Sequence, residues 1–213
     1  MTTEKDIAQR INIYRKDIIE SLKQESIEVY LFLKSQLETT DITKNYLYQF
    51  AYRHFYGMNR AGLTEKFYEE YFKILEEYKN NSKAFKLEKA IEYFGKFNSI
   101  NRKGEKKSLQ FSFLTKLSHS INPDNPIYDK YVCKACGIKQ YYISDTNKKL
   151  ESLLLAYKQI GDIYSKIAKE NSLLEVLKEF DKKFNNNEIS LTMKYDFIFW
   201  QAGKVLESQE IKA

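Results

Sequence analysis

Apolar residues recur at helical spacing along most of the chain, and no alternation between apolar and polar positions runs for more than a few residues. In the first segment, Ile7, Ile11 and Ile18 recur about a turn or two apart, which predicts an amphipathic helix over 3–23. The same pattern predicts further helices over about 27–38, 43–55, 64–75, 82–94, 127–136, 145–170 and 190–206. It also predicts one from about Ser108 to the break at Asn122-Pro123, and one from Ser172 to the polar connector 184–188. We therefore expect an all-α protein, built as a single helical domain over 1–213 or as two lobes that share a core.

Local signals mark several of these helices. Thr64 precedes an apolar run and is expected to cap it, because its hydroxyl can accept from an otherwise unpaired backbone amide. Ser82 is a candidate cap for the next helix, and Ser172 with Glu175 has the spacing of a capping box. Gly161 lies inside the long helix, where glycine costs about 1 kcal/mol relative to alanine.

The face expected to be apolar in the segment 43–55 carries aromatic and aliphatic side chains. It holds Tyr46, Leu47, Phe50, Ala51 and Phe55. This segment ends near Gly57 and is interpreted as bundle-forming material, as are its neighbours.

Composition is typical of a globular chain, with 43% hydrophobic and 30% charged residues. The formal net charge of +6 makes an anionic partner plausible, although a lysine excess is also what biased codon usage produces. No apolar run approaches the roughly 18–20 residues needed to span a bilayer, and the start MTTEKDIAQR lacks the apolar core of a secretory signal. These features predict a cytoplasmic protein without a membrane partner.

Cys133 and Cys136 have the spacing of a metal-binding or redox pair, but four ligands are normally needed to hold zinc. The remaining soft ligands, His54 and His119, lie far away in the sequence. We interpret the cysteines as buried structural residues and each histidine as a hydrogen-bonded core or surface residue, and we predict no metal and no cofactor.

The stretch from Asn101 to Val132 holds both prolines of the chain, Pro123 and Pro126, and the pattern that most suggests chemistry. It opens with a basic turn around Gly104, just before a helix that is expected to begin at about Ser108. Backbone amides at a helix start attract phosphate oxygens, and neighbouring cations add to the attraction. The residues expected to bind a nucleic-acid backbone are Arg102, Lys103, Gly104 and Lys106. The alternative is a solvated charged loop.

Asp129 follows Pro126-Ile-Tyr at the start of the next expected helix. A carboxylate beside a nucleophilic lysine or a water molecule is a workable arrangement for attack on the anomeric carbon of a sugar. The same residue in the same place also makes an ordinary helix N-cap.

The order of basic glycine-containing turn, apolar helix and Pro-x-x-Asp resembles the helix-hairpin-helix DNA glycosylase superfamily, over a segment of about 95–140. Within it, Lys107-Ser-Leu-Gln-Phe111 and Pro126-Ile-Tyr-Asp129-Lys-Tyr-Val132 are similar to the 8-oxoguanine glycosylase branch, including its compact archaeal form. The sequence departs from that branch in having one extra residue between the proline and the aspartate, and Lys103-Gly-Glu105 in place of Gly-x-Gly. The run Leu109-Gln-Phe-Ser-Phe-Leu-Thr-Lys-Leu117 with Pro126-Ile-Tyr-Asp129 more closely resembles a group of bacterial proteins of uncharacterised role. Segments from Tyr52 to Phe72 also resemble that group.

The resemblance implies a DNA-binding hydrolase of DNA repair, a DNA N-glycosylase/AP lyase that flips a modified or damaged base out of the duplex. It implies that Lys107 is the nucleophile and that Asp129 is the acid-base or charge-stabilising partner. Lys116 competes for the role of nucleophile, because it is the lysine within the bacterial pattern. The alternative is a non-catalytic helical binding or interaction module on the same scaffold, in a defence or accessory role, with Asp129 as a cap and Lys116 as a surface or salt-bridge residue.

Overall fold

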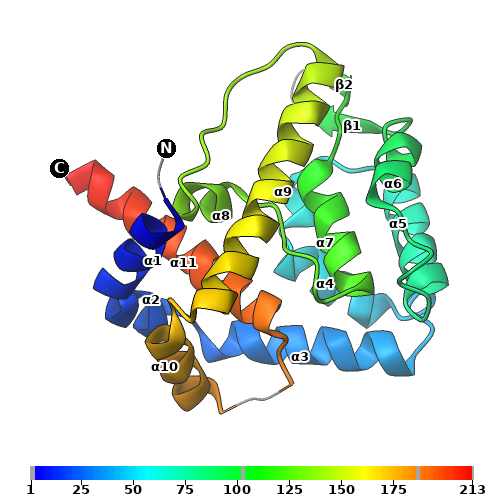
Figure 1. The fold of residues 1–213 in the computed structure, drawn as a ribbon. Coiled ribbons are helices and arrows are strands. Elements are labelled where there is room, and N and C mark those ends of the chain that lie inside the picture. Colours follow the sequence, from blue (N-terminus) through cyan, green and yellow to red (C-terminus); the bar gives the residue numbers. More distant parts are fainter. Residues whose placement is uncertain (1–2, 102–103, 186–187, 213) are drawn as a thin grey trace. The chain divides into compact units, whose positions relative to one another are not determined.

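The computed structural model describes residues 3–101, 104–185 and 188–212, with the side chains of 98–107 and 211–212 left aside. The described chain is helical apart from one pair of short strands, which confirms the predicted fold class (Figure 1). The elements are α1 (Glu4–Ile13), α2 (Arg15–Ser21), α3 (Gln24–Thr39), α4 (Tyr46–Phe55), the 3-10 turn η1 (Met58–Arg60), α5 (Glu65–Tyr78), α6 (Leu87–Phe94), β1 (Asn98–Asn101), β2 (Gly104–Lys107), α7 (Phe111–Ile121), α8 (Lys130–Ala135), α9 (Thr146–Glu170), α10 (Leu174–Phe184) and α11 (Leu191–Lys212).

The chain divides into two compact units, one of which is discontinuous in sequence. Unit 1 consists of residues 1–24 and 124–213, and unit 2 of residues 25–123. In unit 1, α11 packs against α8 and α2, α10 packs against α2, and α9 packs against α1 and α8. In unit 2, α7 packs against α5 and α6, and α4 packs against η1.

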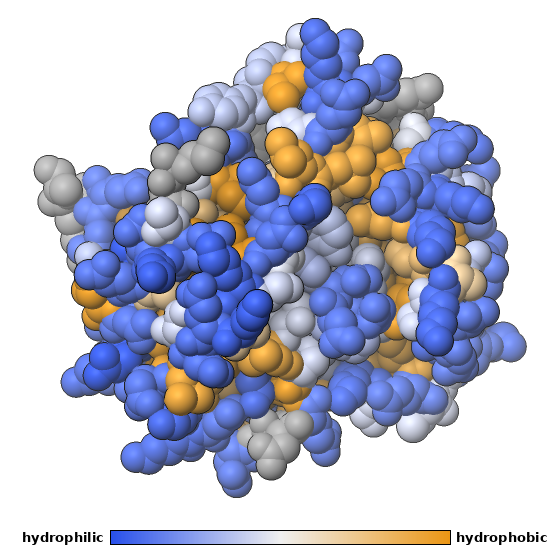
Figure 2. All heavy atoms as spheres, in the orientation of Figure 1, coloured by the Kyte–Doolittle hydropathy of each residue, from blue (hydrophilic) through white to orange (hydrophobic). Residues whose placement is uncertain are grey.

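Aromatic rings fill much of the core of unit 2. Tyr52 is the centre of this core: its ring lies 4.6 Å from that of Tyr56 and 5.6 Å from that of Phe72, measured between centroids. The largest fully buried side chains of this unit are Tyr48, Tyr52, Tyr71, Phe67, Phe72 and Phe94. Figure 2 shows hydrophilic side chains over most of the visible face, as expected for a chain that buries its rings.

One of the predicted helix boundaries is confirmed by its capping bond. The backbone N–H of Phe67 donates to Thr64 Oγ1 over 3.2 Å, so Thr64 caps α5 as expected. Helix α9 is continuous through Gly161. The packing of this long helix offsets the low helix propensity of glycine.

Other boundaries differ from the predictions. The segment 3–23 forms two helices, α1 and α2, which meet at Tyr14. Ser82 does not cap α6, which begins at Leu87 with Lys86 at its N-cap position. Ser172 does not form the predicted capping box, because Leu173 occupies the N-cap position of α10.

The face of α4 that was expected to be buried is in large part exposed. Tyr46, Leu47 and Phe50 face solvent, whereas Tyr48 and Tyr52 on the other face enter the core. Apolar residues lie on both faces of this helix, so the helical period alone could not tell which face is buried.

No helix in the described ranges combines the length and the apolar character that crossing a bilayer requires.

Candidate functional site

Where the sequence predicted a basic turn opening a helix, the described backbone on either side forms a pair of strands. Strands β1 and β2 pair antiparallel, with Asn98 opposite Lys107 and Asn101 opposite Gly104. Arg102 and Lys103 lie outside the described residues, and for Gly104, Lys106 and Lys107 only the backbone is described. The strand pair separates α6 from α7, so the described backbone does not form two helices joined by a short turn.

Lys107 therefore does not open a helix, contrary to expectation. It is the last residue of β2, and α7 begins later, at Phe111, after Gln110 in a left-handed conformation with φ of 48°. The predicted helix start at Ser108 is wrong, so Lys107 does not lie next to the first backbone amides of α7.

Lys116 is a buried lysine on α7, with a side chain that is 8% exposed. Its Nζ donates to the backbone oxygen of Tyr56 over 3.3 Å and to Ser112 Oγ over 3.2 Å. The amine also lies 5.0 Å from the ring centroid of Phe113 and 5.9 Å from that of Tyr56. Two hydrogen bonds and two ring faces thus fix the position of a group that is costly to bury.

Helix α7 holds Lys116 in place because most residues of this helix are buried. Phe111, Leu114 and Leu117 anchor it, and polar neighbours on the same helix are buried with them: Thr115, Ser118 and His119. A helix that is packed over most of its circumference has little freedom to turn about its axis. The amine of Lys116 is therefore presented in one defined direction within unit 2.

A chain of hydroxyl groups runs beside Lys116. The Tyr52 hydroxyl lies 2.9 Å from the Tyr71 hydroxyl and 3.0 Å from Ser120 Oγ. Ser120 donates to the backbone oxygen of Lys116 over 2.9 Å, and Tyr71 donates to that of Phe113 over 2.9 Å. Burial raises the pKa of both tyrosines, so these groups act as neutral hydrogen-bonding groups.

A small cavity lies within unit 2 beside this network. It has a volume of about 30 Å³, and residues from α3, α4 and α7 line it, among them Tyr30, Tyr52, His119 and Ser120. Water needs roughly 10–15 Å³ measured in this way. The cavity as it stands therefore accommodates water but no nucleobase.

Asp129 is placed by unit 1. It is the N-cap of α8, and its Oδ1 accepts from the backbone N–H of Tyr131 over 2.9 Å. The side chain is partly exposed. The expected aspartate that follows Pro126 at a helix start is thus present, and it caps α8.

Asp196, a second carboxyl group, holds the segment that delivers Asp129. It is fully enclosed on α11, and its Oδ1 accepts from the backbone N–H of Ile127 over 3.1 Å and from the Tyr164 hydroxyl over 3.0 Å. Burial raises the pKa of Asp196 well above its usual range, and the charge of Asp129 adds to the rise. The backbone of the Pro126–Asp129 segment is therefore tied to α11 through a buried acid.

The raised pKa of Asp196 predicts that the free energy of unfolding depends on pH. The folded state holds the Asp196 proton more tightly than the unfolded state, so stability is greatest below the unfolded pKa and falls as pH rises towards the folded pKa. Relative to Asp196→Asn, which does not titrate, the wild type should lose about 1.4 kcal/mol per pH unit within that window. Urea unfolding of both proteins from pH 4 to pH 7 measures the difference, and a difference that stays constant or grows in favour of the wild type would contradict the prediction.

Both cysteines are buried and free, as predicted. Burial raises the pKa of Cys133 to about 11 and that of Cys136 well above its usual range, so both favour the neutral thiol over the nucleophilic thiolate. His119 is buried and His54 is exposed, with Nδ1 2.8 Å from Asn59 Nδ2. Within the described ranges, no three side chains of the metal-binding types gather as a metal site would require.

The predicted site residues are thus divided between the units. Lys107 and Lys116 belong to unit 2, and Asp129 belongs to unit 1. Asp196 was missed by sequence reasoning, although the sequence does carry a signal for it. Asp196 lies within the apolar run Tyr195-Asp-Phe-Ile-Phe-Trp200. An acid in such a run is expected to be buried when the helix packs.

Comparison of the chain with protein-family models, with curated proteins and with solved structures found no match.

Proposed function

We propose that the protein is a DNA-binding, glycosylase-like protein that recognises or removes a modified or damaged base, with Lys116 rather than Lys107 as the nucleophile. The observation that carries the choice of lysine is the burial of the Lys116 amine among aromatic rings, with its position fixed by Ser112 and the Tyr56 carbonyl. Desolvated lysines are the ones that serve as Schiff-base nucleophiles in proteins.

The chemistry assigned to Lys116 is attack on the anomeric carbon of the damaged nucleotide. A bond forms from Nζ to that carbon, and the glycosidic bond breaks with its electron pair leaving on the base, which takes up a proton. Opening of the sugar ring then leaves an imine between Lys116 and the sugar. The family resemblance assigns to Asp129, a residue of unit 1, the stabilisation of the positive charge that develops on the sugar, and the borohydride test below measures its charge separately.

Borohydride trapping tests this proposal, because hydride adds to the imine and makes the link between protein and DNA permanent. Duplexes that carry 8-oxoguanine, uracil or an abasic site are incubated with the protein and borohydride, and the adduct is measured on a denaturing gel. We expect an adduct with the wild type, none with Lys116→Gln or Lys116→Arg, and an undiminished adduct with Lys107→Gln. Asp129→Asn keeps a side chain that can cap α8 and should lower the adduct yield through loss of charge alone.

Two outcomes would count against the proposal in different ways. Loss of trapping in Lys107→Gln, with trapping kept in Lys116→Gln, would return the role of nucleophile to Lys107. No adduct on any of these duplexes would favour the second candidate, a non-catalytic binding module. The capping bond of Asp129 and the internal hydrogen bonds of Lys116 favour that candidate, since each residue already has a structural use. Circular dichroism of each variant separates loss of function from loss of fold.

A further inference from the structure

Helix α4 carries an exposed row of aromatic rings. Tyr46 is 79% exposed and Phe50 is 53% exposed, and His54 is exposed on the following turn. Residues four apart lie one above the other on a helix, so these three rings line a single face. Leu47, 66% exposed, lies beside them. We call Tyr46, Leu47, Phe50 and His54 the α4 aromatic face.

The rings of the α4 aromatic face are held in defined positions. The centroids of the Phe50 and His54 rings are 4.1 Å apart. His54 Nδ1 lies 3.0 Å from the backbone oxygen of Phe50 and 2.8 Å from Asn59 Nδ2, which fixes the plane of the imidazole. On the opposite side of the helix, Tyr48 and Tyr52 are packed in the core and hold α4 in place. Rigid rings lose little conformational entropy when a ligand stacks on them.

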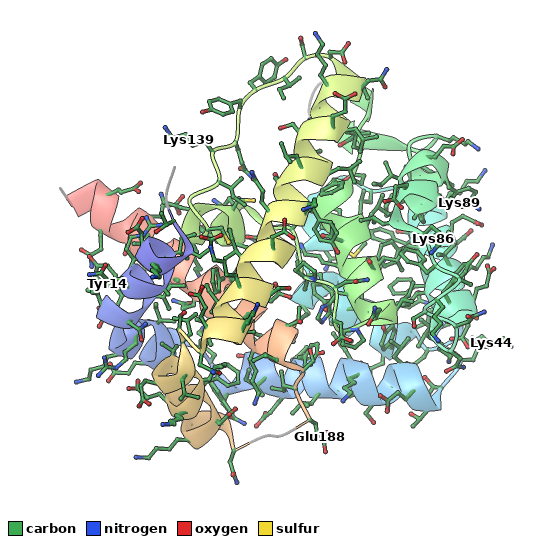
Figure 3. All side chains as sticks on the ribbon, in the orientation of Figure 1. Tyr14, Lys44, Lys86, Lys89, Lys139 and Glu188 are labelled. Atoms are coloured by element: carbon green, nitrogen blue, oxygen red, sulfur yellow. The ribbon has the colours of Figure 1, made fainter. Side chains whose placement is uncertain are left out.

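The sequence stretch that carries this face holds only basic charges. From Ile42 to Thr64 the sequence contains no Asp or Glu, whereas it contains Lys44, Arg53 and Arg60. Figure 3 labels Lys44, which projects from the chain just before α4, and Arg60 is exposed at the end of η1. Carboxylates flank the stretch at each end: Asp41 lies 3.2 Å from Lys44, and Glu65 is exposed at the start of α5. An anionic ligand is thus favoured along α4 and η1.

We infer that the α4 aromatic face binds an unpaired strand of DNA, with bases stacked on Tyr46 and Phe50 and phosphates near Arg60 and Lys44. Base stacking on aromatic side chains combined with cations along the backbone is how proteins hold single strands. In a duplex the faces of the bases are covered by their neighbours and are not available to these rings. The inference rests on the proposed function only for the choice of DNA, and it requires no chemistry at Lys116.

Fluorescence anisotropy with a labelled, lesion-free dT oligonucleotide of about 20 nucleotides at low salt tests this inference, with the full chain as the protein. A double substitution, Tyr46→Gln and Phe50→Gln, removes two exposed rings and keeps good helix formers. We expect it to bind the strand about 30-fold more weakly, which is the order expected for the loss of two stacking partners. The control is Tyr141→Gln with Tyr142→Gln, which removes two exposed rings from the segment before α9 and should leave binding unchanged.

A leucine double variant distinguishes base stacking from docking of an apolar partner, and an Arg60 variant tests the phosphate contact. Tyr46→Leu with Phe50→Leu keeps apolar surface but removes the π-faces, and we expect it to bind as weakly as the glutamine variant. Arg60→Gln should weaken binding and lower the slope of log K against log salt by about 0.7, the value for one phosphate contact on a single strand. Circular dichroism confirms that each variant is folded.

The inference would be overturned by any of three results. These are no binding of the dT strand by the wild type, equal binding by the wild type and the glutamine variant, or full binding by the leucine variant. The last result would assign the face to an apolar protein partner. Failure of borohydride trapping with the dT result intact would reject the proposed catalysis alone, so the two proposals fail separately.

Discussion

A Gly203→Ala variant is expected to be less stable than the wild type by about 3 kcal/mol, at the upper end of the usual cost of overpacking. Gly203 lies where α11 crosses α8 within unit 1. A Cβ built there would meet the backbone of Tyr131, 2.6 Å from its carbonyl carbon and 2.8 Å from its Cα, closer than real Cβ atoms come to other atoms. The obstacle is backbone rather than the end of a flexible side chain, so the two helices must move apart.

The matched control is Gly161→Ala on α9. A Cβ at that position would meet only Pro126 Cγ, at 3.9 Å, which is an ordinary contact. Alanine also favours the helix by about 1 kcal/mol, so this variant should be slightly more stable than the wild type. Urea unfolding of the two variants measures both effects, and equal stabilities would show that α8 and α11 do not approach as closely as described.

Replacing Asp196 by alanine is expected to cost about 3–5 kcal/mol. The substitution leaves two buried donors without their acceptor, the backbone N–H of Ile127 and the hydroxyl of Tyr164. Each such donor costs roughly 1–3 kcal/mol, and the lost volume adds to the cost. Denaturant unfolding at pH 5 measures the effect, and amide hydrogen exchange at Ile127 should become faster as its acceptor is lost.

Two further variants separate the parts of this effect. Asp196→Asn keeps an oxygen acceptor at the same place and should retain most of the stability that alanine loses. Tyr164→Phe removes one of the two donors and should cost about 1 kcal/mol, the value of one hydrogen bond. An alanine variant as stable as the wild type would show that Asp196 does not hold the Pro126–Asp129 segment.

The sequence allowed prediction of the helices and of the cap at Thr64, because both depend on local patterns. The pattern of apolar and polar residues did not predict the strands β1 and β2. The residues 98–107 contain a single apolar side chain, Ile100, so no alternation is visible, and the pairing is made by backbone groups that every sequence carries. Helix α7 was accordingly predicted to begin too early, at Ser108.

Only the part of the candidate site that depends on local sequence was predictable. Asp129 could be recognised as a helix-start aspartate from Pro126 and the apolar run that follows. The burial of Lys116 and the bond from Ile127 to Asp196 depend on residues far away in sequence, such as Tyr56. Local patterns contain no information about such partners, and the same holds for the choice of the exposed face of α4.

The discontinuity of unit 1 has a consequence for synthesis on the ribosome. Residues 25–123 leave the exit tunnel as one continuous stretch, so unit 2 has its whole sequence available while most of unit 1 has yet to be translated. The N-terminal helices α1 and α2 must wait for α9, α10 and α11, their packing partners. The segment 1–24, which is translated before unit 2, therefore packs only after unit 2 has been made, and its apolar face stays exposed in the interval.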